Sequence, residues 1–560
     1  MNRNESWKHK IAYQIYPRSF CDSNGDGIGD LRGITSKLDY LADLGTDYIW
    51  ICPVYASPMD DGGYDVSDYY SINPMFGRME DMDELIAEAG KRGIKILMDL
   101  VLNHCSDEHV WFRRALADPE CEEASYFYFR ESHGTPPNNW RSMFGGSAWE
   151  NVGGDRWYLH LFSKKQPDLN WENPKLRAKL YEMINWWLDK GLGGFRIDAI
   201  THIKKEPTLS SLPADGPDGM VGCFAPTRNY PGIGDFLTEL REQTFDKHDC
   251  ITVAEAAGVP YDQLGEYIGE NGYFSTLFDF SYSELYNYGP GWHTCKSAWE
   301  WPITDLRDKM FASQLETEKI GFGAVYFENH DYPRACEKFI PHEYQSELTQ
   351  KMLGTLFFFL RGIPFIYQGE ELGMTNTRFE SIDDVDDIST KNHYRIALAD
   401  GLTPQQALKA VNRYSRDNGR VPFPWNAGKN GGFTSGTPWM KPHPDYIRFN
   451  AKDEAADEGS VLNYYKKMIR LRKSAEYTET LSTGSIQPIL LDYPDIIAYT
   501  REGGRKAAVI CSFSPYPLAV KCGFSVNKAL ISNYPEIPAQ ENGSVTFPPF
   551  FAGVFDITEE

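Results

Sequence analysis

Short apolar runs rich in β-branched and aromatic residues recur along the first 370 residues, and helical patterns separate them. Such runs predict buried strands. Three of the helical patterns, at 35–44, 80–92 and 174–190, end just before a glycine, which is a common helix C-terminal signal. Eight strand–helix units predict an α/β fold, a (β/α)8 TIM barrel. The predicted strands are 11–17, 48–54, 95–101, 194–199, 251–255, 274–279, 323–327 and 363–367.

Two stretches interrupt this alternation. Residues 104–170 are rich in Trp, Asn, Gly and Pro and lack helical periodicity, so they predict an inserted subdomain after the third strand. Residues 375–445 predict a second insertion after the eighth strand, with a helical centre at 403–417. From about 482 onward, short strands alternate with turn residues. We therefore predict a barrel over 1–103 and 171–481, the inserted subdomain over 104–170, and an antiparallel β domain over 482–560.

The composition narrows the classes of partner. The chain has 56 basic and 79 acidic residues, a net charge of −23, which disfavours nucleic acid and anionic membranes. No stretch approaches 18 uncharged apolar residues, and the first residues lack the apolar region of a secretory signal. The ten cysteines show no C-x-x-C pair and indicate reduced thiols. We expect a cytoplasmic protein, a monomer or a small homo-oligomer, without a nucleic-acid or membrane partner.

Acidic, basic and imidazole side chains follow four of the predicted strands. The carboxyl ends of barrel strands form one face of the fold, so these side chains should lie close together. This concentration favours an active site over isolated structural roles. The residues are His104 after the third strand, Arg196 and Asp198 in the fourth, Glu255 at the end of the fifth, and His330 and Asp331 after the seventh.

The two acids on adjacent strands fit glycoside hydrolysis, which needs two carboxyl groups flanking the scissile bond. Arg196 lies two residues before Asp198, on the same side of the strand, and should keep Asp198 ionised as a nucleophile. Negative charge from Asp198 and Asp331 should keep Glu255 protonated as a general acid. His104 and His330 could hold sugar hydroxyls. Zinc binding by the two histidines is the alternative, disfavoured because nothing nearby has zinc-ligand spacing.

Several longer strings support this interpretation. They are Tyr13-Gln-Ile-Tyr-Pro-Arg-Ser-Phe, Gly63-Tyr-Asp-Val-Ser-Asp-Tyr69, Gln166-Pro-Asp-Leu-Asn170 and Ser415-Arg-Asp-Asn-Gly-Arg420. Together with the strand ends they resemble glycoside hydrolase family 13, the α-amylase family, over most of the chain. Within it the last two strings are similar to the oligo-1,6-glucosidase and α-glucosidase branch. The resemblance implies a retaining, exo-acting α-glucosidase for short oligosaccharides or disaccharides such as isomaltose, isomaltulose or maltose.

The resemblance also implies roles for individual residues. Asp198 would be the nucleophile, Glu255 the general acid/base and Asp331 the stabiliser of the transition state. Asp65 and Arg416 would clamp the 4-hydroxyl of the terminal glucose, although a loop-capping role is the alternative for Asp65. The implied glucose pocket comprises Tyr64, Asp65, His104, Gln166, Arg196, His330 and Arg416, with Phe144 and Phe162 as walls unless they belong to the core.

A separate loop has the ligand order of a calcium site. Oxygen donors stand at loop positions 1, 3, 5 and 9, a glycine at 6, and a main-chain carbonyl would serve at 7. Position 12 is Gly33 instead of the glutamate of a full EF-hand, and a turn-rich surface loop is the alternative. We expect a structural Ca²⁺ site, without an organic cofactor. Its ligands would be Asp22, Asn24, Asp26, Ile28 and Asp30.

Linkage preference stays open at this stage. Ala199 follows the nucleophile, where many α-1,6-preferring relatives carry Val, and a smaller side chain widens the far side of the pocket. The second enzyme hypothesis is a transglucosidase or a sucrose isomerase. The stretch Phe280–Glu284 lacks the arginine-rich loop of sucrose isomerases, which favours hydrolysis. A non-catalytic barrel protein is disfavoured because such relatives lose the acids and carry a transmembrane helix.

Overall fold

The predicted barrel is present and closed in the computed structural model, which describes residues 5–216, 218–283, 285, 291–538, 540–541 and 543–559. All eight strands pair in parallel, and the last strand pairs with the first. The strands are β1 (Ala12–Ile15), β2 (Tyr48–Ile51), β5 (Lys95–Val101), β10 (Gly194–Asp198), β12 (Ile251–Glu255), β13 (Thr276–Phe278), β14 (Ala324–Val325) and β15 (Ile363–Tyr367).

Large side chains fill the interior of the barrel. Trp50, Phe278 and Phe365 are buried and pack with ring centroids 4.9–6.1 Å apart. Because this interior is solid, the active groups can stand only at the strand ends. The alternating helices include α2 (Leu38–Leu44), α3 (Met79–Lys91), α5 (Pro174–Asp189), α6 (Ile233–Gln243), α7 (Leu264–Ile268), α8 (Ile303–Glu318), α10 (Glu347–Phe358) and α14 (Val461–Lys473).

Glycines end the helices where the sequence predicted it. Gly45 caps α2 with φ 101°, and Gly191 follows α5 with φ 100°. A side chain at Gly45 would also lie 2.6 Å from Ile469. The left-handed backbone and the close approach both require glycine at this position.

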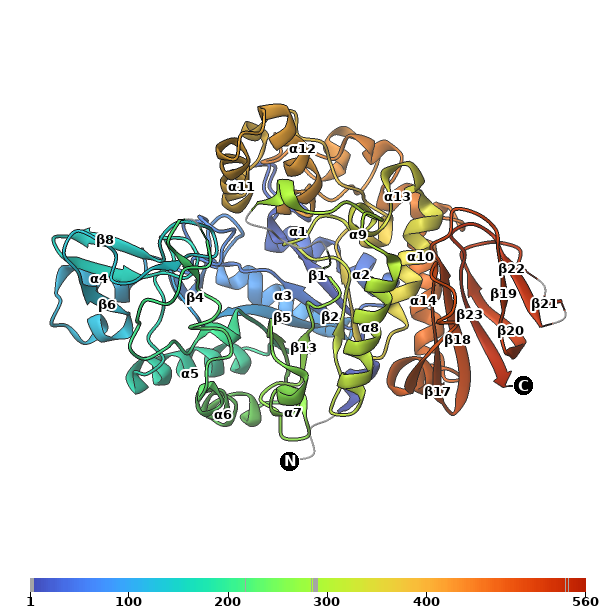
Figure 1. Cartoon of the computed structure of the whole chain (residues 1–560), viewed down its shortest axis with the longest axis horizontal. Helices are drawn as coiled ribbons and strands as arrows, with labels where there is room; N and C mark the ends of the chain where they lie inside the picture. Colours follow the sequence, from blue (N-terminus) through green and yellow to red (C-terminus); the bar gives the residue numbers. More distant parts are fainter. Residues whose placement is uncertain are drawn as a thin grey trace.

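The segment after β5 leaves the barrel and forms a separate lobe, in cyan at the left of Figure 1. It contains a helix that the sequence analysis did not predict, α4, capped by the ring of His109. A second segment, after β10, returns to this lobe: β11 pairs with β7, and Val221 and Cys223 join its small core. The elements are α4 (Val110–Ala117), β6 (Phe129–Glu131), β7 (Trp140–Arg141), β8 (Trp149–Gly153), β9 (Arg156–Leu159) and β11 (Val221–Gly222).

Two helices follow β15 and lie above the barrel in Figure 1. They are α11 (Ile388–Ala399) and α12 (Pro404–Tyr414), of which only α12 coincides with the predicted helical centre. The amide of Asn392 in α11 donates a 2.8 Å hydrogen bond to the carbonyl of Phe144 in the lobe after β5. The lobe after β5 and the insertion after β15 are therefore in direct contact. Shorter elements elsewhere in the first 481 residues are β3 (Tyr55–Ala56), β4 (Asp68–Ile72), α1 (Leu31–Ser36), α9 (Ala335–Phe339) and α13 (Ala451–Ala456).

The C-terminal region is all β, as predicted. An antiparallel five-stranded sheet in the order β16-β17-β18-β23-β20 faces a three-stranded sheet in the order β19-β22-β21 across an apolar core. The strands are β16 (Ser485–Ile489), β17 (Ile496–Gly503), β18 (Arg505–Ser512), β19 (Leu518–Lys521), β20 (Phe524–Ser532), β21 (Gln540–Glu541), β22 (Ser544–Phe547) and β23 (Ala552–Glu559).

Candidate active site

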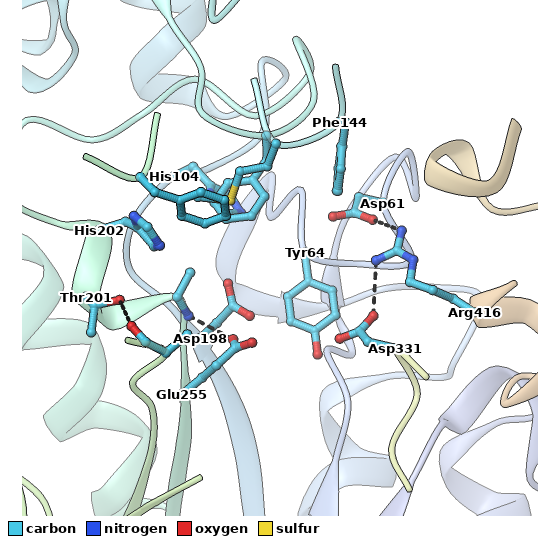
Figure 2. Close-up of a pocket in the computed structure, with 15 residues that line it drawn as sticks. Asp61, Tyr64, His104, Phe144, Asp198, Thr201, His202, Glu255, Asp331 and Arg416 are labelled. Carbon is cyan, nitrogen blue, oxygen red and sulfur yellow. Dashed lines mark hydrogen bonds and ion pairs between the residues drawn. The ribbon is translucent and has the colours of Figure 1, made fainter. Parts of the chain in front are cut away.

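Asp198 and Glu255 end two hydrogen-bonded strands. β10 pairs with β12 on one side and with β5 on the other, so their carboxyl ends share one edge of the barrel. Both acids line one pocket there, as Figure 2 shows. Ala199 turns the chain away from β10 with a left-handed backbone, φ 42° and ψ 32°, and its N–H donates to Oε2 of Glu255 at 3.0 Å. The turn thus ties the chain after the first acid to the second acid.

Arg196 joins the two acids. Its Nη1 donates to Asp198 at 2.8 Å and its Nη2 to Glu255 at 2.6 Å, and Nη1 also donates to Asp99 at 2.8 Å. Arg196 lies against Asp198 as the sequence analysis expected, and it binds Glu255 and Asp99 as well. Burial raises the pKa of Asp198 well above its usual range, Arg196 opposes this, and the charges of Glu255 and Asp99 add to it. Asp198 is therefore harder to ionise than an ordinary aspartate.

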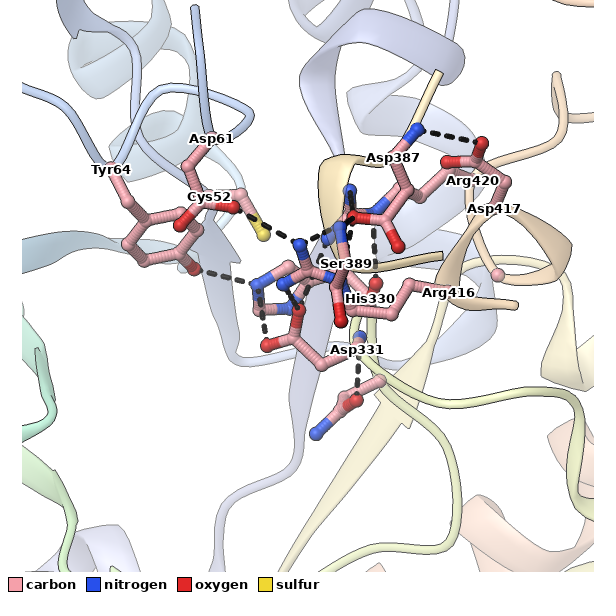
Figure 3. A network of polar contacts seen from close by, with 12 residues as sticks. Cys52, Asp61, Tyr64, His330, Asp331, Asp387, Ser389, Arg416, Asp417 and Arg420 are labelled. Carbon is pink, nitrogen blue, oxygen red and sulfur yellow. Dashed lines mark hydrogen bonds and ion pairs between the residues drawn. The ribbon is translucent and has the colours of Figure 1, made fainter. Parts of the chain in front are cut away.

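Arg416 closes the opposite side of the pocket. It donates to Asp61 and Asp331, both at 3.1 Å, and to Asp387 at 2.5 Å. Arg420 adds a second guanidinium, 3.1 Å from Asp331. Figure 3 shows this cluster of two arginines and three carboxylates. Burial alone would raise the pKa of Asp331, but His330 and the two arginines outweigh it and lower that pKa. Asp331 therefore stays ionised.

Asp65, which we expected to clamp the 4-hydroxyl together with Arg416, is not among the residues that line the pocket. The carboxylate of Asp65 is fully buried and accepts the backbone N–H groups of Asp60 at 2.8 Å and Asp61 at 3.2 Å. It shapes the loop, which agrees with the alternative capping role. Asp61, four residues earlier, lines the pocket and pairs with Arg416. The sequence analysis did not single out Asp61, because only the conformation of the loop shows which of the two aspartates faces the pocket.

Two other predicted residues, His330 and Gln166, are buried and do not line the pocket. The hydroxyl of Tyr64, which itself lines the pocket, bonds Asp99 at 2.9 Å and His330 at 2.7 Å. His330 is fully buried, and Gln14 donates to its Nδ1, so its Nε2 carries the proton. Gln166 lies 3.1 Å from Nε2 of His104 and donates to Asp61 at 3.2 Å. These residues hold the lining groups in place.

The aromatic walls are placed as the sequence analysis expected. Phe144 and Phe162 both line the pocket, with ring centroids 5.8 Å apart. Phe162 packs against His104 at 5.0 Å, and the guanidinium of Arg416 lies 5.5 Å from the Phe144 ring. His104 also lines the pocket, and burial lowers its pKa to about 4, so its ring is neutral. Neutral imidazole and aromatic faces suit a sugar.

Sequence reasoning missed several lining and supporting groups. Asp387 belongs to an acidic run at 383–387, and such a run is typical of solvated surface. In the structure, however, Asp387 is buried against Arg416. Other lining side chains come from loops without a motif: Met143, Thr201, His202, Phe224 and Ala257. Glu284, part of the stretch that argued against isomerisation, lies outside the described residues.

The acids of the predicted calcium loop accept hydrogen bonds from other groups of the protein. Asp22 accepts four hydrogen bonds, from the amides of Asn24, Gly25 and Gly27 and from the hydroxyl of Thr434, which uses all four of its lone-pair sites. Both oxygens of Asp30 also have partners within the loop and the helix after it. Among the residues that the structure describes, no three His, Cys, Asp or Glu side chains are placed to hold a metal ion. The donor types suit calcium, and the acids at positions 1 and 9 of the loop accept hydrogen bonds from protein groups.

Comparison with known proteins agrees with the barrel and its acidic pocket. Residues 14–481 match the model of the alpha amylase catalytic domain. The chain belongs to the alpha-amylase family. This family member is 42% identical to an oligo-1,6-glucosidase of Parageobacillus thermoglucosidasius, over 98% of this chain and 99% of the other. It is 41% identical to a glucan 1,6-alpha-glucosidase of Streptococcus pneumoniae, over 94% and 95% of the two chains.

Solved structures of other family members have the same fold. The trehalulose synthase of Pseudomonas mesoacidophila MX-45 matches with a TM-score of 0.92 and 38% identity over 99% of both chains. The trehalose-6-phosphate hydrolase of Bacillus licheniformis matches with a TM-score of 0.91 and 36% identity, over 99% of this chain and 100% of the other. The alpha-amylase family member described here is a glycoside hydrolase. No helix in its described part is long and apolar enough to cross a membrane.

Proposed function

We propose that this chain is a retaining, exo-acting α-glucosidase that releases glucose from the non-reducing end of short α-glucosides. The observation that supports this most is the pocket itself. The paired carboxyls of Asp198 and Glu255 stand beside it, and Asp61, Arg416 and Asp331 occupy its opposite side (Figure 2). A terminal glucose bound by the polar cluster would present its anomeric carbon to the two acids.

The reaction follows in two displacements. Ionised Asp198 attacks the anomeric carbon, and a covalent glucosyl ester forms as the bond to the leaving oxygen breaks. Glu255 gives its proton to that oxygen. In the second displacement Glu255 takes a proton from water, the water oxygen attacks the anomeric carbon, and Asp198 leaves as a carboxylate. Arg196 fixes both acids by charge-assisted hydrogen bonds. Two inversions give net retention.

The exo mode rests on the ion pair of Arg416 and Asp61. Both groups are largely buried, with 14% and 8% of their side chains exposed. A fixed donor and a fixed acceptor on this side of the pocket suit the last hydroxyls of a chain. The names of the relatives favour α-1,6 linkages, so we propose isomaltose-like substrates.

The decisive experiment is a kcat/KM panel over isomaltose, maltose, isomaltulose, sucrose and trehalose, with the anomer of the first-formed glucose read by NMR. We expect α-glucose and the highest kcat/KM on isomaltose. Initial β-glucose, or internal cleavage of a long dextran, would overturn the proposal. With concentrated sucrose, an excess of isomeric disaccharides over free monosaccharides would instead favour the sucrose isomerase alternative. Turnover retained by Asp198→Ala would refute the catalytic assignment.

We further propose that the loop of Asp22, Asn24, Asp26, Ile28 and Asp30 binds Ca²⁺ in a structural role. The order of oxygen donors along the loop supports it. Asp22 must exchange loop donors for the ion, so we expect weak binding. Calcium should raise Tm relative to EDTA in the natural chain but not in Asp26→Ala, whose carboxylate is exposed and accepts only the Ile28 N–H in the described part. An unchanged Tm in calcium would contradict the proposal.

A cytoplasmic location and a monomeric or small homo-oligomeric state are also proposed. The sequence has no C-x-x-C pair and no other metal-type cysteine spacing, which supports a reducing compartment. Fractionation of the source cells and light scattering of the purified protein would test both statements. An extracellular fraction or a large assembly would contradict them.

A further inference from the structure

The loop after β14 carries His330 and Asp331, and buried contacts join its two ends. Glu328 and Arg334 have only 2% and 1% of their side chains exposed, and Nη1 of Arg334 donates to Oε2 of Glu328 at 2.9 Å. The other carboxylate oxygen of Glu328 accepts the backbone N–H of Ala335 at 2.8 Å. The side chain of Glu328 therefore closes the loop across its base, with His330 and Asp331, both shown in Figure 3, between the two ends.

The base of this loop is also attached to the rest of the barrel. Arg334 donates a hydrogen bond from Nη1 to the carbonyl of Gln368, just after β15, at 2.9 Å. Its backbone N–H donates to the side chain of Asn376, in the insertion after β15, at 2.9 Å. Lys338 donates to the carbonyl of Phe327, immediately before the loop, at 2.8 Å. The base of the loop is therefore held from both ends, and Arg334 joins it to the neighbouring strand.

The middle of the loop is held by groups of the opposite kind, which attract its carboxylate from one side. Asp331 accepts hydrogen bonds from Arg416 and Arg420, both at 3.1 Å. Its own backbone N–H donates to the side chain of Asn329 at 2.8 Å, which is a contact within the loop. Because both guanidinium groups attract the carboxylate towards the insertion after β15, its position relative to Asp198 depends on how firmly the backbone of the loop is held.

We propose that Glu328 and Arg334 are positioning residues for Asp331, and that their buried ion pair fixes the loop so that this carboxylate faces the reacting sugar. The inference rests on the proposed glucosidase function, in which Asp331 stabilises the transition state. The sugar ring gains positive charge only as that state is approached. A displaced Asp331 should therefore lower kcat, whereas the ground-state contacts of Asp61 and Arg416 should keep KM nearly unchanged.

The first variants change the acid at the base of the loop. Glu328→Gln has one acceptor oxygen where the carboxylate has two, so either Arg334 or the N–H of Ala335 loses its partner. We expect kcat for isomaltose to fall about tenfold, the scale of one charge-assisted hydrogen bond, with KM within about twofold of the natural value. Glu328→Asp keeps the charge on a shorter side chain, and its kcat should lie between those of Glu328→Gln and the natural chain.

Glu318→Gln is the matched control. Glu318 also accepts a backbone N–H, that of Ile486 at 3.2 Å, and it also pairs with an arginine, Arg361, at 3.9 Å. It is the last residue of α8, shortly before the chain enters β14, so it lies at the face of the barrel opposite to the pocket. This variant should change neither kcat nor KM.

A double-mutant cycle distinguishes positioning of Asp331 from a merely structural role. With α-glucosyl fluoride as substrate, Glu328→Gln should lower kcat about tenfold in the natural chain but less than about twofold in Asp331→Asn, because the group that Glu328 positions is already lost. Thermal unfolding shows whether each variant is folded. Should Glu328→Gln not fold, Glu328→Asp takes its place in the cycle, where its smaller loss of kcat should likewise disappear in Asp331→Asn.

Two results would overturn the inference while the glucosidase function stands. One is an equal loss of kcat in both backgrounds of the cycle, which would show that the ion pair does not act through Asp331. The other is a folded Glu328→Gln with the kcat of the natural chain. A natural chain that hydrolyses neither isomaltose nor α-glucosyl fluoride would instead refute the proposed function.

Discussion

Nη2 of Arg196 lies 2.6 Å from Oε2 of Glu255, the group proposed to carry the catalytic proton, although the same guanidinium also holds Asp198. An arginine that serves both acids cannot decide which one is ionised. The ionisation of Asp198 depends instead on its burial and on the neighbouring carboxylates, which raise its pKa. In the ligand-free enzyme, the state of the nucleophile is therefore coupled to that of its partner.

The acid limb of the pH profile should reflect this coupling. Asp198 must be ionised to attack, so a raised pKa makes kcat/KM fall at a higher pH than an ordinary aspartate, near 3.9, would allow. Glu255→Gln removes the neighbouring charge and should move the limb to lower pH. We would measure this with α-glucosyl fluoride, whose leaving group needs little acid assistance. A limb that stays in place would contradict the coupling.

Asp61 and Asp65 should respond differently to the same change. Asp61→Asn removes a charge-assisted bond to Arg416 and should lower kcat/KM for isomaltose about 10- to 150-fold, with little change in Tm. Asp65→Asn disturbs a buried carboxylate that accepts two backbone amides and should cost about 1–3 kcal/mol of stability. Thermal unfolding and steady-state kinetics on both variants separate the roles. The reverse pattern would restore Asp65 as the sugar ligand.

His109 should make stability depend on pH. Burial lowers its pKa from 6.5 to about 4. Between these values the unfolded chain binds a proton that the folded chain does not, so the histidine's contribution is lost as pH falls from 6.5 towards 4. The stability advantage of the natural chain over His109→Gln should shrink across that window in urea unfolding. A gap between the two chains that stays constant across that window would count against the pKa direction.

Ala199→Val should shift linkage preference. Ala199 directly follows Asp198 and lines the pocket, and added methyl groups narrow the pocket there. We expect kcat/KM for maltose to fall more than that for isomaltose, because Val is typical of α-1,6-preferring relatives. The effect should not exceed about 1–3 kcal/mol, or 10- to 200-fold, for a contact of this size. Ala199→Ser, of similar size, should leave the ratio unchanged; an unaltered ratio in the valine variant would place specificity elsewhere.

Local signals sufficed for the barrel but not for all of the pocket. Buried strands such as Ile251–Glu255 are short apolar runs, and Gly45 and Gly191 mark helix ends through their own backbone freedom. The catalytic acids follow from their places at strand ends. Asp387 could not be found in this way, because its burial depends on Arg416, which lies 29 residues away on another element. Likewise β11 exists only through its pairing with β7, about 80 residues earlier.

The ion pair of Arg416 and Asp61 joins residues 355 positions apart. At a synthesis rate of 5 to 20 residues per second, Asp61 is made roughly 20 to 70 seconds before its partner. By the time Arg416 is added, every barrel strand and both catalytic acids have been translated, but until then Asp61 and Asp331 lack the guanidinium that joins them. A ribosome-bound chain that stops before residue 416 should therefore have the catalytic pair and no high-affinity sugar site. The sugar site can therefore form only late in translation, after Arg416 has been added to the chain.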